Sequence, residues 1–74
     1  MNKENVISIL KKVNYPNYTR DIISFGILDS IKISDNNIFL QLQLKADNQI
    51  IEKIKSDIKL ALETEFSNVN INIE

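Results

Sequence analysis

The 74-residue sequence contains no cysteine, histidine or tryptophan, and has only one glycine and one proline. Without histidine and cysteine, the usual general base, nucleophilic thiolate and zinc or iron–sulfur ligands are missing. A phosphate-binding loop needs several glycines, whereas Gly26 stands alone. We therefore predict that the chain has no catalytic or metal-binding residues, is not an enzyme, and acts by binding.

The sequence also has no segment in which charges of one sign are concentrated. Nine basic residues stand against ten acidic ones, and no segment gathers the lysines and arginines that a nucleic-acid-binding surface needs. Residues 1–14 mix charged and apolar side chains, unlike a signal peptide or a membrane span. We predict no nucleic-acid partner, no membrane partner and a cytoplasmic location.

Apolar residues make up 43% of the chain, which is enough for a folded core. The length is below the roughly 100–150 residues of a usual domain, so a second core is excluded. We expect residues 1–74 to form a single domain.

The first half of the chain predicts a helix followed by a turn. Apolar side chains at helical spacing indicate a helix over residues 3–13, with Asn2 as its N-cap, and Pro16 disfavours helix beyond that point. Residues 19–25 favour one or two helical turns, with Thr19 as the cap and Gly26 in a left-handed conformation at the end. A strand over residues 22–27 is the alternative, because β-branched residues dominate there.

The second half predicts a hairpin, a long helix and a last strand. Residues 31–34 and 38–44 alternate apolar and polar side chains around the turn at 35–37. Residues 48–66 carry a long apolar stripe, with Asp47 or Asn48 as the N-cap. Residues 69–73 alternate again, and a crossover makes this strand parallel to one of the hairpin.

These elements give an α+β fold, a two-layer α/β sandwich of order α-β-β-α-β. The mixed three-stranded sheet carries both helices on one face and leaves its other face partly open. Phe39 lies on the open face, opposite the leucines, where it is either an ordinary exposed aromatic or part of a docking surface.

One segment combines aromatic side chains with the only arginine of the chain. Residues 15–21 read Tyr-Pro-Asn-Tyr-Thr-Arg-Asp. A guanidinium beside aromatic rings is enriched at protein interfaces. The plain alternative is that the tyrosines cover the edge of the core while Arg20 pairs with a carboxylate or a helix C-terminus. Gly26 is either a helix C-cap or a point where a ligand approaches the backbone.

The run Arg20-Asp21-Ile22-Ile23-Ser24-Phe25-Gly26, on this order of elements, resembles the small N-terminal domain of the Mrp/ApbC-type iron–sulfur carrier P-loop ATPases and SufT-like assembly proteins. It is similar to the D-I-V-x-x-G signature of that family. Tyr15-Pro16-Asn17 stands where many members have Asp-Pro-Glu. Many members also carry a reactive cysteine between the second strand and the long helix, whereas residues 45–49 here contain none.

The resemblance implies a cysteine-free accessory domain that binds protein during iron–sulfur cluster assembly or transfer. We expect it to be the N-terminal domain of a longer protein, in which the cluster and ATP belong to other parts. The partner would be a client apo-protein or the ATPase domain of the same chain. The site residues that we predict are Tyr15, Tyr18, Arg20, Asp21, Phe25 and Gly26.

A module for oligomerisation or intramolecular packing is the alternative function. The open sheet face and the two sheet edges favour this reading, with a homodimer as the form that would use them. A nucleic-acid-binding domain of similar element order is disfavoured by the near-zero net charge and by the single glycine, which cannot form a Gly-x-x-Gly clamp.

Overall fold

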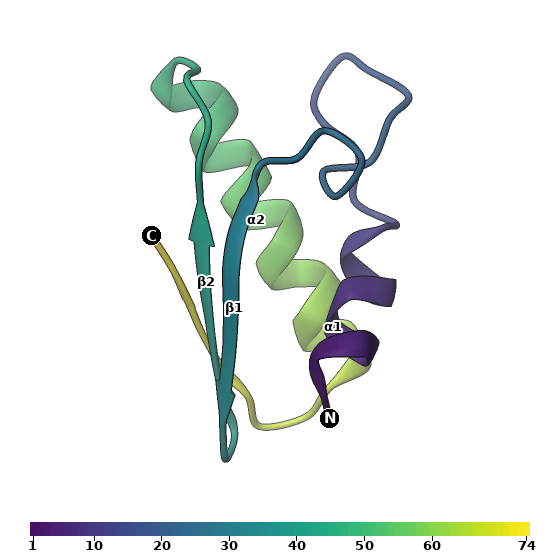
Figure 1. Ribbon diagram of the computed structural model, residues 1–74, viewed down its shortest axis with the longest axis vertical. Coiled ribbons are helices and arrows are strands. Elements are labelled where there is room, and N and C mark those ends of the chain that lie inside the picture. Colours follow the sequence, from purple (N-terminus) through teal and green to yellow (C-terminus); the bar gives the residue numbers. More distant parts are fainter.

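The computed structural model describes residues 1–74 and has the element order that the sequence predicts. The elements are α1 (Lys3–Leu10), β1 (Leu28–Ser34), β2 (Asn37–Leu42), α2 (Asn48–Glu65) and β3 (Asn70–Ile73). The sheet order is β1-β2-β3, with β1 antiparallel and β3 parallel to the central strand β2. Both helices lie on the same side of the sheet (Figure 1). The predicted two-layer α+β fold is therefore confirmed.

The core is entirely aliphatic. No polar or charged residue is buried, and the two helices, the central strand and the connection between α1 and β1 all contribute. The buried residues are Val6, Ile9, Leu10, Val13, Ile22, Ile27, Ile38, Leu40, Ile54, Ile58 and Leu62. Close packing of branched side chains stabilises a domain of this size, since no disulfide is present to assist.

Helix α1 is shorter than predicted. Asn2 caps it as expected, because the Asn5 backbone N–H donates to Asn2 Oδ1 at 2.8 Å. The last residues of the predicted helix instead form a tighter turn, in which the Val13 N–H donates to the Leu10 carbonyl at 3.0 Å. The reason is that Asn14 pairs with Asp21 in an isolated antiparallel bridge, which requires extended backbone at Asn14.

The hairpin follows the predicted alternation, with one irregularity. Its two-residue loop contains Asp35 in the left-handed region at φ 53°. The register shifts between Leu28 and Ser30, so that Asp29 is an extra residue on β1. The bulge lets Leu28 and Ile31 both face the core, although three positions separate them.

Helix α2 begins and ends where the sequence predicts. Asp47 is its N-cap, because Asp47 Oδ1 accepts from the Ile50 N–H at 3.0 Å. Beyond the helix, Asn68 adopts φ 57° and turns the chain into β3. No helix of the structure is long and apolar enough to span a membrane.

Candidate functional site

Residues 14–21 form a loop that is closed at its base. The Asn14–Asp21 bridge is flanked by two backbone hydrogen bonds: Tyr15 N–H to the Arg20 carbonyl at 3.0 Å and Ile22 N–H to the Val13 carbonyl at 2.9 Å. Because Val13 and Ile22 are both buried, the base of the loop is fixed to the core. The loop stands at the upper right of the molecule (Figure 1).

The tip of this loop is a tight turn. The Tyr18 N–H donates to the Tyr15 carbonyl at 3.0 Å, Pro16 occupies the second position, and Asn17 adopts φ 70°. Proline followed by a residue with positive φ is the pattern of a type II turn. The turn brings Tyr15 and Tyr18 close together although two residues separate them.

Three aromatic rings pack against one another at the surface. The Tyr15 and Phe25 rings are stacked with centroids 4.6 Å apart, and the Tyr18 ring meets both edge-on, at 5.6 Å from Tyr15 and 5.2 Å from Phe25. Such pairs add about 0.5–1.5 kcal/mol beyond the area that they bury. Tyr15 and Phe25 are half-buried, whereas Tyr18 remains 59% exposed.

Arg20 lies over this cluster. Its Cζ is 5.2 Å from the centroid of the Phe25 ring, and its Nη2 donates to the Ser24 carbonyl at 2.9 Å. The hydrogen bond fixes the guanidinium at one end, while the exposed planar group can still bind an incoming carboxylate or aromatic ring. We call Tyr15, Tyr18, Arg20 and Phe25 the aromatic–arginine patch.

Asp21 and Gly26 bracket a single helical turn beneath the patch. Asp21 accepts from the Ser24 N–H and from the Ser24 hydroxyl, both at 2.9 Å. At the other end, Gly26 has φ 74°, its N–H donates to the Ile23 carbonyl at 3.0 Å, and the Ile27 N–H donates to the Ile22 carbonyl at 3.4 Å. This is the Schellman arrangement that ends helices.

The structure confirms the predicted helical turn in this segment and corrects the residue at which it begins. Gly26 is left-handed as expected, but the cap is Asp21 and the predicted cap Thr19 is wrong. The Asn14–Asp21 bridge keeps the chain extended up to Asp21, so the turn begins only after it. The alternative strand over residues 22–27 is also wrong, because this segment is a turn and β1 begins at Leu28.

All six predicted site residues therefore lie together. Four of them form the surface of the patch, and the other two, Asp21 and Gly26, hold the turn that carries Phe25. Sequence reasoning missed Ser24, which bonds to both Asp21 and Arg20. The signal was present, since Asp-x-x-Ser has the three-residue spacing of a capping interaction.

The contacts with Ser24 affect the pKa of the Asp21 carboxyl, which can be measured. Hydrogen bonds from Ser24, chiefly from its backbone N–H, lower the pKa of the Asp21 carboxyl below its ordinary value of 3.8. We predict that Ser24→Ala raises this pKa part of the way back, because the variant keeps the backbone donor and loses the hydroxyl. An NMR titration of the Asp21 side-chain carboxyl measures both values, and equal pKa values in the two proteins would contradict the role of the hydroxyl.

The sign of the stability effect follows from this direction. A carboxyl with a lowered pKa in the folded state stabilises the fold at pH values above its ordinary pKa of 3.8. That contribution is lost as the pH falls through the folded pKa. The unfolding free energy of Ser24→Ala should therefore be lower than that of the unchanged chain at neutral pH, and the difference should shrink as the pH falls through the folded pKa.

The connection between β2 and α2 lies at the same end of the molecule as the loop (Figure 1). The Gln43 N–H donates to the Ile27 carbonyl at 2.7 Å, which joins the connection to the residue after Gly26. The carboxylate of this connection, Asp47, caps α2. No group of three or more histidine, cysteine, aspartate or glutamate residues could hold a metal ion.

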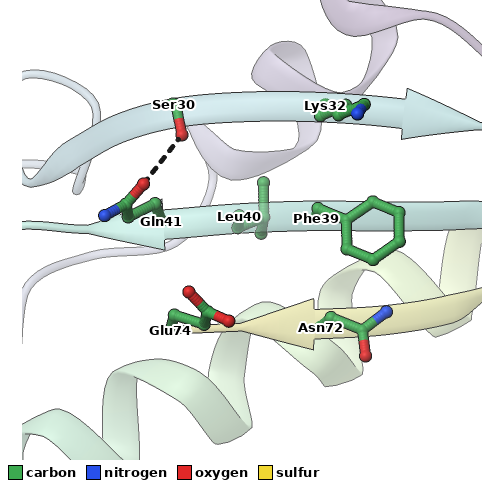
Figure 2. Close-up of a pocket in the computed structure, with 7 residues that line it drawn as sticks. All are labelled: Ser30, Lys32, Phe39, Leu40, Gln41, Asn72 and Glu74. Carbon is green, nitrogen blue, oxygen red and sulfur yellow. Dashed lines mark hydrogen bonds between the residues drawn. The ribbon is translucent and has the colours of Figure 1, made fainter.

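Phe39 lies on the open face of the sheet, away from the aromatic–arginine patch. It is 41% exposed, and its cross-strand neighbours are Lys32 on β1 and Asn72 on β3. A shallow pocket of about 300 Å³ lies around Phe39 on this face. Its lining residues are drawn in Figure 2, where the dashed line marks the long hydrogen bond of 3.5 Å between Ser30 and Gln41. The predicted position of Phe39 opposite the leucines is confirmed.

Comparison with known proteins gives two matches. Residues 3–73 match the family described as "Iron-sulfur cluster assembly protein". Over 49 residues, the chain is 31% identical to an "Iron-sulfur cluster carrier protein" of Helicobacter pylori, a match that covers 66% of this chain and 13% of that protein. The chain thus corresponds to a small part of this relative. No solved structure matches.

Proposed function

Because the chain belongs to the iron–sulfur cluster assembly protein family, we propose that it is a non-catalytic domain that binds a protein partner through the aromatic–arginine patch. The partner is either a client apo-protein or the ATPase part of an iron–sulfur carrier. The cluster is the cargo of the assembly process, and we place this process in the cytoplasm. The carrier name of the relative and its greater length support a partner of this kind.

The observation that carries the proposal is the packing of the patch at the surface. Exposed Tyr18 and Arg20 provide two of the three side-chain types that are enriched among the residues with the largest binding energies at protein interfaces. The edge-on contact with Phe25 holds the Tyr18 ring, and the Phe25 ring face together with the Ser24 carbonyl holds the Arg20 guanidinium, before a partner arrives. A preordered surface loses less conformational entropy on binding, which raises affinity.

The side chains of this chain do not fit a cluster. Iron–sulfur clusters are held by cysteine thiolates, with histidine as the usual substitute, and the sequence has neither. In the proposed function the ligands therefore come from the partner, and this domain supplies recognition.

The test is a binding measurement with Tyr18→Ala plus Arg20→Ala. Calorimetric titration with a purified apo iron–sulfur protein, and separately with the ATPase part of an iron–sulfur carrier, gives the dissociation constant. We expect the double variant to raise it at least about tenfold, or 1.4 kcal/mol, for one of the two partners. Both residues are exposed, so the fold should be retained.

The matched control is Lys32→Ala plus Phe39→Ala. This pair also removes one cation and one aromatic ring from exposed, neighbouring positions, but on the open sheet face. It should leave the dissociation constant within about twofold. The patch would be refuted as the recognition surface if the two double variants lost the same affinity, or if Tyr18→Ala plus Arg20→Ala bound as tightly as the unchanged chain.

A further inference from the structure

Strand β3 is an edge strand whose outer side is free to pair. Asn70 N–H donates to the Asn36 carbonyl at 2.9 Å and Glu74 N–H to the Leu40 carbonyl at 3.0 Å, so both face β2. Alternate residues of a strand direct their backbone groups to opposite sides. Ile71 and Ile73 therefore direct their N–H and C=O groups away from the sheet.

The two edges of the sheet differ in how readily they can pair with an additional strand. On the β1 edge, the bulge at Asp29 breaks the regular row of backbone groups, which discourages a further strand. Strand β3 pairs with β2 in unbroken register, contains no proline, and has only asparagine and isoleucine side chains. The β3 edge is therefore the one that suits an added strand.

A groove runs along this free edge. Its volume is about 580 Å³, and it lies between the end of the chain at residues 71–74 and one stripe of α2. The stripe has the spacing i, i+3, i+4 and i+7 and consists of Glu52, Lys55, Ser56 and Lys59. A strand added to β3 with a helix above it would fill the groove.

We infer that the occupant of this groove is a second copy of the chain, paired β3 to β3 in antiparallel fashion about a two-fold axis. With Asn72 on the axis, Ile71 lies opposite Ile73 of the second copy. Ile71 and Ile73 are the β3 residues whose backbone groups face outward. In this register, the free N–H and C=O groups of both residues therefore form hydrogen bonds with the second copy. The half-buried Ile71 and Ile73 side chains are then covered, and the sheet becomes six-stranded.

The charges of α2 select a second copy over another partner. The helices of the two copies run antiparallel, and an axis between Lys55 and Ser56 places Glu52 opposite Lys59 of the second copy. Two equivalent ion pairs result. An extended peptide without a helix could also pair with the β3 backbone. It would leave the α2 charges Glu52, Lys55 and Lys59 without partners.

The proposed contact consists of one four-residue strand pair and two ion pairs, so we expect a weak dimer. We expect a dissociation constant on the order of 100 µM, because contacts of this size lie at the low end of specific interfaces. Sedimentation velocity over about 10 µM to 1 mM chain at low salt should show the mass rising towards that of two chains, and high salt should weaken the association.

Charge reversals provide the decisive test. Glu52→Lys or Lys59→Glu alone places like charges opposite each other twice and should weaken the dimer about tenfold. The two changes together recreate both ion pairs and should restore the dissociation constant to within about twofold. A double variant as weak as the single ones would overturn the proposed symmetry, and a chain that stays monomeric throughout would overturn the dimer.

A second variant tests the strand pairing itself. Ile73→Pro removes an outward N–H that the sheet does not use, so the fold should remain intact by circular dichroism. The dimer should be lost. Unchanged dimerisation of Ile73→Pro would refute the β3 contact. The contact would also be refuted if the unchanged chain stayed monomeric and its Ile71 and Ile73 amide signals shifted only when a client peptide was added. In that case the client, and not a second copy, would bind the β3 edge.

Discussion

Leu62→Ala should lower the free energy of unfolding by about 2–5 kcal/mol. Leu62 is fully buried in the core, on the inner face of α2. Its truncation removes apolar contact and leaves a cavity that an aliphatic core can only partly close. A core of this size rarely provides more than about 3–5 kcal/mol in total. The variant should therefore be largely unfolded at 25 °C, which urea denaturation followed by circular dichroism measures.

Leu60→Ala is the matched control for this prediction. It makes the same chemical change on the same helix two residues earlier, but Leu60 is 69% exposed. Both variants gain the same small helix propensity from alanine, so their difference reports burial alone. We expect Leu60→Ala to change stability by no more than about 0.5 kcal/mol. Similar losses in both variants would mean that α2 does not pack as described.

Gly26→Val should lower the free energy of unfolding by about 2 kcal/mol, and Gly26→Ala by about 1 kcal/mol. The cause is backbone strain, since Gly26 has φ 74° and the Schellman turn depends on that angle. Collision is excluded because a Cβ at this position has no atom within 4 Å. Thermal unfolding of the variants gives the values.

The mirror-image residue separates strain from collision at Gly26. A chain of this length is accessible to chemical synthesis, so D-alanine can be placed there. D-alanine prefers positive φ and should be at least as stable as glycine, because it also restricts the unfolded chain. A loss as large as that of L-alanine would contradict the account of this turn.

The regular elements could be predicted because their signals are local. The spacing of apolar side chains predicts helix α2 and the hairpin. Ordinary capping preferences predict Asp47 and Asn2 as the N-caps of the two helices. The differences arise where distant segments meet. The Asn14–Asp21 bridge ends α1 early and moves the cap from Thr19 to Asp21, and no local propensity reports such a contact.

The candidate site divides in the same way. Two tyrosines and the only arginine within seven residues indicate a binding surface from the sequence alone. The stacking of Tyr15 on Phe25, by contrast, depends on the positive φ of Asn17 and on the single turn between Asp21 and Gly26. The proposed pairing through the β3 edge depends on the sheet order, which the sequence leaves open.

The two proposed surfaces do not compete. The loop with the aromatic–arginine patch stands at the upper right of the molecule, whereas the C-terminal strand β3 forms its left edge (Figure 1). A dimer paired through β3 would therefore leave both patches free. Two copies of the recognition surface in one assembly would raise the effective affinity for a partner that presents two sites.

The central claim is that a protein partner binds at the aromatic–arginine patch. The most direct test is an NMR titration of the ¹⁵N-labelled chain with an unlabelled apo iron–sulfur protein and, in parallel, with the ATPase part of an iron–sulfur carrier. We expect one of them to shift the backbone amide signals of residues 15–26 while those around Phe39 stay in place. Shifts confined to the Phe39 face, or no shifts with either partner at saturating concentration, would contradict the claim.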